Sequence, residues 1–463
     1  MLNKSILSLL LAGVILVGCN SKPEPIAIDP SPIHPEWTAN TNIYEVNVRQ
    51  YTPEGTFNAF AEHLPRLQEM GVDILWFMPV QPIGVARRKG ELGSYYSISD
   101  YRGINPEFGT HDDFHELVMK IHELGMKVII DWVPNHTAWD HYWMDEHTDF
   151  YYIDPETGEI SNGRNDHNQP TDWTDVAELD YNNPEMQHFM IEDMRFWIEE
   201  HDIDGFRCDM AGGQTEDFWR RANEDLRNVK RNIFMLAESN FPVLHDCGFN
   251  ASYAWEFHHL LNKVARGEAP VSEIEHYIHL DAKRFPQNAM RMMFIDNHDE
   301  NSWNGTVESR LGPNAQAAFA LALTMPNSIP LIYSGQEVSL NHSLEFFQRD
   351  TINWDGPSQA DFYSSMLTLK STQPALRNGD WGGAYHRIEV DHPRCFAVGR
   401  HLEGNTVVTL VNFSGEDLTV NMSGVPKGKY VDWVDGETAN LGIGGADIDI
   451  PANSYMVLVR NKH

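Results

Sequence analysis

The stretch THDDFHELVMKIHELGMKVIIDWV, residues 110–133, contains one helix and one strand of a pattern that recurs along the chain. Thr110-His-Asp-Asp113 is a capping box, which predicts the start of a helix. Apolar residues then recur at helical spacing from Phe114 to Leu124, and Gly125 predicts the helix end. Residues 127–133 are apolar on both faces, which is typical of a strand buried in a parallel sheet.

The same alternation extends in both directions from this unit. Strands are expected at residues 43–48, 74–79, 127–133, 205–210, 233–238, 249–254, 292–296 and 330–333. Eight such strands alternating with helices predict a (β/α)₈ barrel, with an open doubly wound sheet as the alternative. No glycine-rich phosphate motif follows the first strand, which counts against a dinucleotide-binding version of the open sheet.

Two regions depart from the alternation. Residues 137–180 are polar, aromatic and rich in turns, and they predict a small inserted subdomain after the third strand. From residue 377 onward, short strands such as 394–401, 406–411 and 454–459 are separated by Gly, Asn and Asp. We therefore expect a barrel domain over 39–376 and a C-terminal antiparallel β-sandwich over 377–463.

The N-terminus predicts export. A basic start and a short apolar run precede Leu16-Val-Gly-Cys19, which resembles a bacterial lipobox. We expect a signal peptide over 1–18, lipidation of Cys19, and a Pro-rich tether over 19–38 that anchors the protein at the periplasmic face or the cell surface. An ordinary secretory signal with a chance cysteine is the alternative. The other cysteines, Cys208, Cys247 and Cys395, could form at most one disulfide.

Length and charge narrow the class of function. The chain has 463 residues, with 34 Lys and Arg against 67 Asp and Glu, a formal net charge of −33. A surface with this negative charge repels phosphate backbones and polyanionic substrates. Nucleic acid is therefore excluded as a partner. A neutral, hydroxyl-rich substrate such as a carbohydrate is compatible with this charge. The sequence does not indicate the oligomeric state.

Polar side chains follow the expected strands at the edge where barrel enzymes place their active sites. They are Asp131, Asn135, His136, Arg207, Asp209, Glu238, His298 and Asp299. A structural ring of ion pairs is the alternative to a catalytic site. Two carboxyl groups facing one bond are the equipment of glycoside hydrolysis.

The surroundings of the two carboxyl groups suggest different roles for them. Arg207 lies two residues before Asp209, so both side chains point to the same side of a strand, and the cation is expected to keep Asp209 ionised. Glu238 follows the apolar run 234–237, where desolvation is expected to raise its pKa. A nucleophile must be ionised and an acid must carry a proton.

Four segments around these residues resemble the conserved regions of the α-amylase family of glycoside hydrolases. They are residues 131–136 (DWVPNH), 205–209 (GFRCD), 234–238 (FMLAE) and 294–299 (FIDNHD), in the family's order. The resemblance implies a retaining mechanism with Asp209 as nucleophile, Glu238 as acid/base and Asp299 as the carboxylate that distorts the sugar. It also implies that His136, Arg207 and His298 surround the cleaved ring. Tyr96 matches the aromatic platform under that ring, and Tyr95 competes for this role.

The sequence departs from the family at one point. Many members have a Lys-His pair shortly after the nucleophile, and this chain has Ala211-Gly-Gly213 there. In the family that histidine often supplies a calcium ligand, so the resemblance does not decide whether this chain binds calcium. Asn135 and Glu178 fall at ligand-like positions, but no metal site is assigned. No required cofactor is expected.

The resemblance implies hydrolysis of α-1,4-linked glucans or maltooligosaccharides. A glucanotransferase or isomerase on the same scaffold is the first alternative. A non-catalytic glycan-binding lipoprotein is the second, and the three intact acidic residues count against it.

Overall fold

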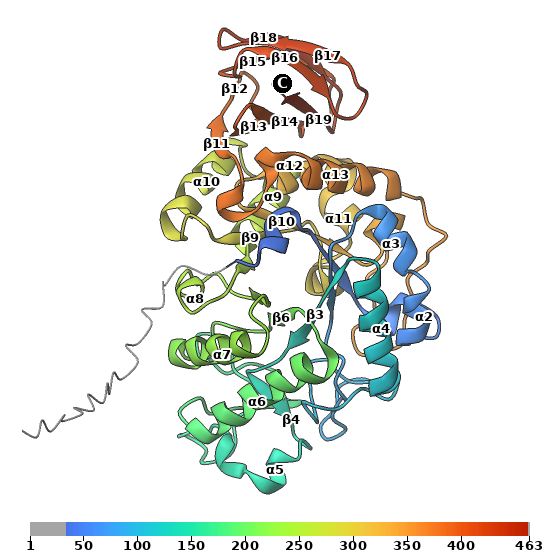
Figure 1. The fold of residues 1–463 in the computed structure, drawn as a ribbon, viewed down its shortest axis with the longest axis vertical. Coiled ribbons are helices and arrows are strands. Elements are labelled where there is room, and N and C mark those ends of the chain that lie inside the picture. The colour runs from blue at the N-terminus through green and yellow to red at the C-terminus, as the bar shows by residue number, and fades with distance from the viewer. Residues whose placement is uncertain (1–33, 462–463) are drawn as a thin grey trace, which may run out of the picture.

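The computed structural model describes residues 34–461, and its centre is a closed barrel of eight parallel strands (Figure 1). Around the barrel the strands run in the order β1-β10-β9-β8-β7-β6-β3-β2. Their bounds are β1 Ile43–Val46, β2 Ile74–Phe77, β3 Lys127–Trp132, β6 Gly205–Cys208, β7 Phe234–Ala237, β8 Ala251–Tyr253, β9 Met290–Met293 and β10 Ser328–Tyr333. The predicted (β/α)₈ barrel is therefore confirmed, and the open sheet is wrong, because β1 pairs with both β2 and β10.

Helices follow the barrel strands and surround them. The longer ones are α2 Phe57–Ala61, α3 Leu64–Met70, α4 His111–Glu123, α6 Pro184–His201, α7 Glu216–Val229, α9 Trp255–Ala265, α10 Ser272–Arg284, α11 Val307–Leu311, α12 Ala315–Thr324 and α13 Ala360–Thr372. Short turns of helix are α1 Val48–Tyr51, α5 Trp143–Glu146, α8 Val243–Asp246, η1 Glu36–Asn40, η2 Thr148–Phe150, η3 Glu300–Asn304, η4 Gly312–Asn314, η5 Gln336–Val338, η6 Pro374–Leu376 and η7 Gly379–Trp381. The capping box at the start of α4 is present as predicted.

The segment between β3 and α6 folds back on itself as a small subdomain. Its strands β4 (His136–Ala138) and β5 (Val176–Glu178) pair antiparallel, with α5 and η2 between them. Because β4 begins four residues after β3 ends, the subdomain stands at the carboxyl edge of the barrel, beside the predicted site.

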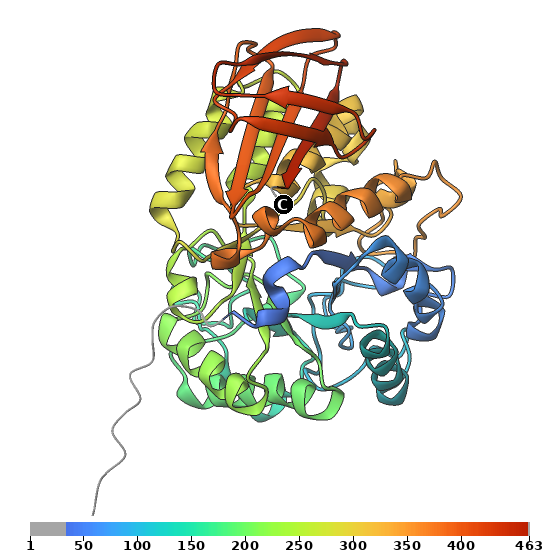
Figure 2. The same ribbon diagram turned by 45° about the horizontal axis from the view of Figure 1, so that its top comes forward.

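The C-terminal part is an antiparallel sandwich of a six-stranded and a three-stranded sheet, and it sits over the helices of the second half of the barrel (Figure 2). Its strands are β11 Ala384–Arg387, β12 Glu389–Val390, β13 Cys395–Leu402, β14 Asn405–Asn412, β15 Leu418–Ser423, β16 Gly428–Asp432, β17 Thr438–Leu441, β18 Ala446–Ile450 and β19 Ser454–Asn461. Strands β14 and β19 pack against α12, so the sandwich is joined to the barrel through buried side chains.

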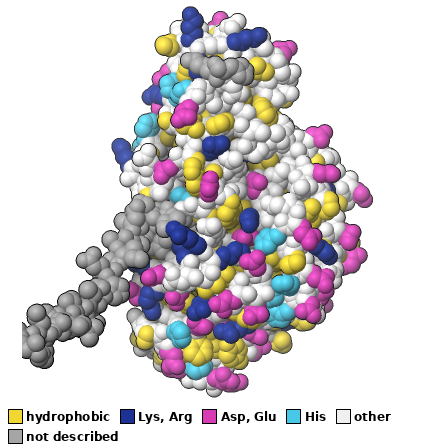
Figure 3. Space-filling view, in the orientation of Figure 1, with side chains coloured by type: hydrophobic (Ala, Val, Ile, Leu, Met, Phe, Trp, Pro, Cys, Tyr) yellow, Lys and Arg dark blue, Asp and Glu magenta, His cyan; other side chains and the backbone are white. Residues whose placement is uncertain are grey.

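The predicted signal peptide, the lipidation of Cys19 and most of the predicted tether lie outside the described residues. The last residues assigned to the tether contact the barrel: Thr38 is buried, and the indole N–H of Trp37 donates to the carbonyl of Asn232 at 3.0 Å. Within residues 34–461, no helix is both long and apolar enough to span a bilayer. Asp and Glu side chains are spread over the barrel part of the face in Figure 3, interspersed with Lys and Arg.

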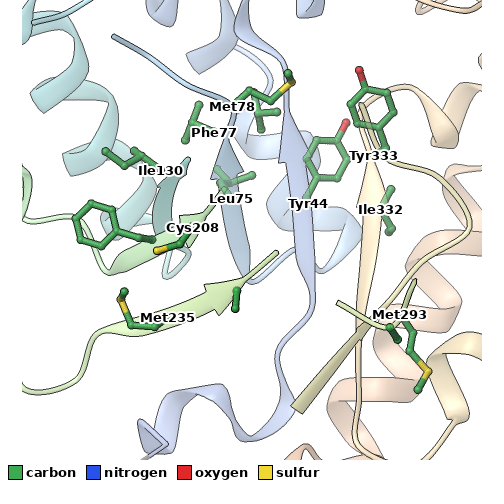
Figure 4. Close-up of a cluster of buried hydrophobic side chains, with 14 of the residues drawn as sticks. Tyr44, Leu75, Phe77, Met78, Ile130, Cys208, Met235, Met293, Ile332 and Tyr333 are labelled. Atoms are coloured by element: carbon green, nitrogen blue, oxygen red, sulfur yellow. The ribbon is translucent and has the colours of Figure 1, made fainter. Parts of the chain in front are cut away.

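Successive residues of each barrel strand belong to two different cores, because side chains alternate across a strand. Ile43, Ile74 and Ile129 fill the inside of the barrel, whereas their neighbours Tyr44 and Leu75 pack outward against the helices. Figure 4 shows part of this outer core. Cys208 lies in this outer core and is fully buried. Cys247 and Cys395 are almost fully buried, and all three cysteines are free.

Candidate active site

The inward-facing positions of three strands become charged at the carboxyl end of the barrel. Two residues after the inward Ile43 comes Glu45, and two after the inward Ile129 comes Asp131. Arg207 occupies the equivalent position on β6. All three have no exposed surface, so the top of the barrel core is a set of buried charges. Buried charges need partners. Arg207 pairs with Asp131, and Glu45 pairs with His298, which follows β9.

Arg207 is the centre of this set. Its Nη1 donates to Asp131 Oδ1 and to Asp209 Oδ1, both at 2.8 Å, and its Nη2 lies 2.9 Å from Glu238 Oε2. Its Nε donates to the hydroxyl of Tyr253 at 3.1 Å. Burial disfavours the guanidinium charge, but the carboxylates more than offset this and raise the pKa of Arg207. One permanent cation therefore serves three carboxyl groups.

Asp209 and Glu238 are held by the same guanidinium, Asp209 through Nη1 and Glu238 through Nη2. Burial and the neighbouring Glu238 raise the pKa of Asp209 well above its usual range. Burial also raises the pKa of Glu238, but Arg207 and the backbone N–H of Met210, 3.0 Å away, outweigh it, so the net pKa of Glu238 is lowered.

This order of pKa values corrects the sequence-based expectation, which had Asp209 ionised and Glu238 protonated. The expectation was wrong because it gave Arg207 to Asp209 alone, whereas the guanidinium reaches both carboxyl groups. In the absence of a sugar, the raised pKa of Asp209 and the lowered pKa of Glu238 place the proton of the pair on Asp209.

His298 and Asp299 follow β9 on the adjoining side of the pocket. His298 Nδ1 lies 2.5 Å from Glu45 Oε1, and its Nε2 lies 3.5 Å from Asp299 Oδ2. Burial lowers the pKa of His298, but Asp299 and Glu45 raise it to about 9, so the imidazole is a cation at neutral pH. Both ring nitrogens then carry protons, and Nε2 donates to the hydroxyl of Tyr96 at 2.7 Å.

Tyr96, and not Tyr95, faces the pocket. Its ring stacks on His298 with centroids 5.5 Å apart and an interplanar angle of 21°, and its hydroxyl donates to Asp131 at 3.1 Å. Tyr95 is 1% exposed, lies under the guanidinium of Arg49 at 4.2 Å, and does not line the pocket. Of the two candidates for the platform, Tyr96 is therefore the one that lines the pocket.

These side chains open into a pocket of about 480 Å³. It is lined by Lys89, Ser94, Tyr96, His136, Asp172, Trp173, Asp175, Val176, Asp209, Met210, Glu238, His298, Asp299, Trp303, Phe346 and Phe347. Of the predicted site residues, Tyr96, His136, Asp209, Glu238, His298 and Asp299 reach the pocket surface, whereas Arg207 lies beneath it. Aromatic faces beside carboxyl groups suit a ring that carries hydroxyl groups.

His136 and the ligand-like pair lie at the edge towards the inserted subdomain. Burial lowers the pKa of His136 to about 4, so it is a neutral imidazole at the pocket wall. Asn135 Nδ2 donates to Glu178 Oε2 at 3.0 Å, and the N–H of Arg164 donates to the same oxygen at 2.8 Å. Burial raises the pKa of Glu178 to about 8.

The amide nitrogen of Asn135 lies between two oxygens at this position, since it also donates to the carbonyl of Arg164 at 2.9 Å. The amide of Gln214 donates to Asn135 Oδ1 at 3.4 Å, and within residues 34–461 no group of three His, Cys, Asp or Glu is placed to hold a metal. The departure at Gly213 has a steric reason as well: a Cβ there would lie 2.8 Å from Asn135 Oδ1.

Two members of the charged set were not assigned a role from the sequence, although a signal was present. Glu45 is a charged residue inside the apolar strand segment Ile43–Val46, and Asp131 stands within Lys127–Trp132 in the same way. A carboxylate inside a strand that is apolar on both faces has no solvent to turn to, so it must meet a buried cation. The uncharged Tyr253, whose hydroxyl accepts from Arg207 Nε, was also not assigned a role, and the sequence carried no comparable signal for it.

Comparison with known proteins agrees with this geometry. Residues 32–382 match the family model described as the alpha amylase catalytic domain. The alpha-amylase MalA of Haloarcula japonica is 27% identical over 446 residues, which cover 93% of this chain and 63% of that protein. Among solved structures, the maltogenic alpha-amylase AmyB of Thermotoga neapolitana (26% identity, TM-score 0.82) and an alpha-amylase of Lactobacillus plantarum (29%, 0.81) cover 92% and 91% of this chain and 99% of their own. The match of the family model over most of the chain shows that this protein belongs to the alpha-amylase family of glycoside hydrolases.

Proposed function

We propose that the protein is a retaining glycosidase that cleaves α-1,4-glucosidic bonds in starch-type glucans or maltooligosaccharides. The observation that carries the proposal is the Asp209–Glu238 pair on one guanidinium, with Asp299 beside it in the same pocket. The pair supplies one ionised and one protonated carboxyl group, which are the two forms that a retaining glycosidase uses. The names of the similar proteins, alpha-amylases and a maltogenic alpha-amylase, support the substrate class.

In the first step a carboxylate oxygen of Asp209 attacks C1 of the sugar. The bond from C1 to the glycosidic oxygen breaks, its electron pair stays on that oxygen, and Glu238 donates the proton that the oxygen takes up. The single proton of the pair must therefore sit on Glu238 when the glycosidic oxygen is present. Once the proton has moved from Asp209 to Glu238, Arg207 Nη1, 2.8 Å from Asp209 Oδ1, stabilises the Asp209 carboxylate that attacks.

In the second step Glu238, now ionised, takes a proton from water while the water oxygen bonds to C1. The bond from C1 to Asp209 breaks and returns its electron pair to the carboxylate. Asp299 and the cationic His298 offer an acceptor and a donor to the hydroxyl groups of the same ring, and Tyr96 lies under it. These groups hold the ring while positive charge develops at C1.

A sugar hydroxyl can replace water in the second step, which would make the protein a glucanotransferase. Incubation with maltoheptaose and sizing of the early products separates the two activities. Shorter products support hydrolysis, whereas longer oligosaccharides as the main early products would favour the transferase. No reaction with maltoheptaose, starch, cyclodextrins or pullulan would overturn the proposal and favour a non-catalytic glycan-binding protein.

We also propose that the protein is exported and anchored through lipid on Cys19, on the support of the lipobox-like Leu16-Val-Gly-Cys19. Partition into the detergent phase of Triton X-114 should be lost in Cys19→Ser and kept in Cys395→Ser, whose thiol is buried. Equal partition of both variants would contradict the anchor. We propose no metal or other cofactor for the reaction, because its groups are all side chains of this chain.

A further inference from the structure

The side of the pocket away from Glu238 is the side of β1. In the barrel β7, which carries Glu238 at its end, is the fourth strand from β1 in both directions. Strands β2 and β10 flank β1. Loops that follow β1, β2 and β10 therefore stand across the pocket mouth from Glu238, and these loops form a continuous wall.

The wall is made where the loops after β2 and β10 meet. The N–H of Leu92 donates to the carbonyl of Phe347 at 3.0 Å. Gly90, with φ of +64°, fits so closely that a Cβ there would lie 2.4 Å from Phe347 Cβ. Phe346 and Phe347 line the pocket, and the exposed Trp303 packs against both with ring centroids 5.3 and 6.0 Å away.

Two fully buried side chains of α1 hold the wall from behind. Arg49 donates from Nη1 to the carbonyl of Gly93 at 3.2 Å and from Nη2 to that of Leu92 at 3.4 Å. Gln50 donates from Nε2 to the carbonyls of Glu345 and Gln348 at 2.8 and 3.2 Å. Its Oε1 accepts from the N–H of Asp350 at 2.7 Å. The two terminal nitrogens of Arg49 and the side-chain amide of Gln50 thus bind loop backbone, which fixes the position of both loops.

Lys89 extends the wall to the inserted subdomain. Its Nζ donates to the carbonyl of Asp172 at 2.8 Å and lies 3.3 Å from Asp175 Oδ1. All three residues line the pocket. The pocket is therefore bounded, opposite Glu238, by loops that are hydrogen-bonded to one another from the subdomain to the loop after β10.

In a 1,4-linked glucan each glucose is bonded to its two neighbours through C1 and C4, which lie at opposite ends of the ring. Glu238 protonates the oxygen that leaves, so the departing part of the glucan lies on its side, and the units before the cleaved bond extend towards the wall. We infer that this wall stops the chain, so that the enzyme acts only where a free non-reducing end lies against Lys89 and Phe347, releasing short products. The inference rests on the proposed function, since it takes the direction of the glucan from the role of Glu238.

The test compares maltoheptaose with maltoheptaose whose non-reducing glucose carries a 4,6-O-benzylidene group, with products sized by chromatography. We expect the blocked substrate to be cleaved with kcat/KM lower by about tenfold or more. The double variant Lys89→Ala/Phe347→Ala, which opens the wall, should recover cleavage of the blocked substrate. Arg87→Ala is the matched control, because Arg87 lies on the same loop but covers the ring of Trp139 outside the pocket.

The outcomes separate the two proposals. Equal cleavage of both substrates by the unchanged protein, or release of mid-length products from the start, would overturn the wall and leave the glycosidase intact. Cleavage of neither substrate would overturn the proposed function itself. Failure of the double variant to cleave the blocked substrate, while it still cleaves free maltoheptaose, would show that other residues stop the chain and would overturn the assignment to Lys89 and Phe347.

Discussion

Arg207→Lys is the perturbation that tests the geometry of the site most severely. It keeps the positive charge but replaces the planar guanidinium, which has several donor nitrogens, by a single ammonium group. The guanidinium touches Asp131, Asp209 and Glu238 through two nitrogens. A lysine ammonium has a single nitrogen and cannot reach all three carboxyl groups from the same place. We expect it to stay with Asp131 and Asp209, which share Nη1, and to lose Glu238, which contacts Nη2.

The size of the effect follows from that one contact. A hydrogen bond to a charged group contributes about 1.5–3 kcal/mol. If it is lost in the transition state, kcat/KM falls by about 10- to 150-fold. The pH profile should also change. Arg207 lowers the pKa of Glu238, so weakening the contact raises that pKa, the pair holds its protons to higher pH, and the acidic limb of kcat/KM moves to higher pH.

The assay is kcat/KM on maltotriose across pH, with thermal unfolding measured in parallel. Arg291→Lys is the control, because Arg291 is equally buried but contacts Asp281 at 3.1 Å and no residue of the pocket. It should lose stability without a shift of the acidic limb. A loss of less than about threefold for Arg207→Lys with an unmoved acidic limb would refute the view that one guanidinium sets the state of both carboxyl groups.

Three further outcomes are expected. Glu45→Gln should move the basic limb of kcat/KM to lower pH, because Glu45 helps to hold the pKa of His298 at about 9 and the cation is lost as pH rises through that value; an unmoved basic limb would contradict the pairing. Dialysis against EDTA should leave Tm and kcat unchanged, and loss of activity restored by calcium alone would contradict the self-satisfied pair at Asn135 and Glu178. Lys370→Met should lower the free energy of unfolding by about 3 kcal/mol, since Lys370 Nζ donates to three buried acceptors, whereas the exposed Lys283→Met should not; equal stability of the two in urea would count against this.

The barrel could be predicted from the sequence because its strands are apolar on both faces, a pattern that parallel sheets require. The same pattern places Asp209, Glu238 and Asp299 together, since each follows a strand whose end lies at the same rim. It also contained Glu45, whose charge interrupts a buried strand. What it could not give was the state of the carboxyl pair, because that depends on how two nitrogens of Arg207 are divided among partners from three different strands.

The position of the wall could not be predicted from the sequence for another reason. Gln50 holds residues that lie 295 to 300 positions further along the chain, and Arg49 holds a loop 43 and 44 positions away. Neither residue stands at a strand end or in a recognisable motif. Local patterns predict elements, but contacts between loops depend on where the closed barrel places the loop ends, which only the three-dimensional structure shows.

The central claim, that Asp209 forms a covalent bond with the sugar while Glu238 moves the proton, can be measured directly. Glu238→Gln lacks the base for the second step, whereas α-maltosyl fluoride needs no acid for the first, because fluoride leaves without a proton. Reaction of this variant with the fluoride, followed by mass spectrometry of its peptides, should show one maltosyl group attached to Asp209. A maltosyl group on another residue, or steady turnover of the fluoride with no adduct, would contradict the account.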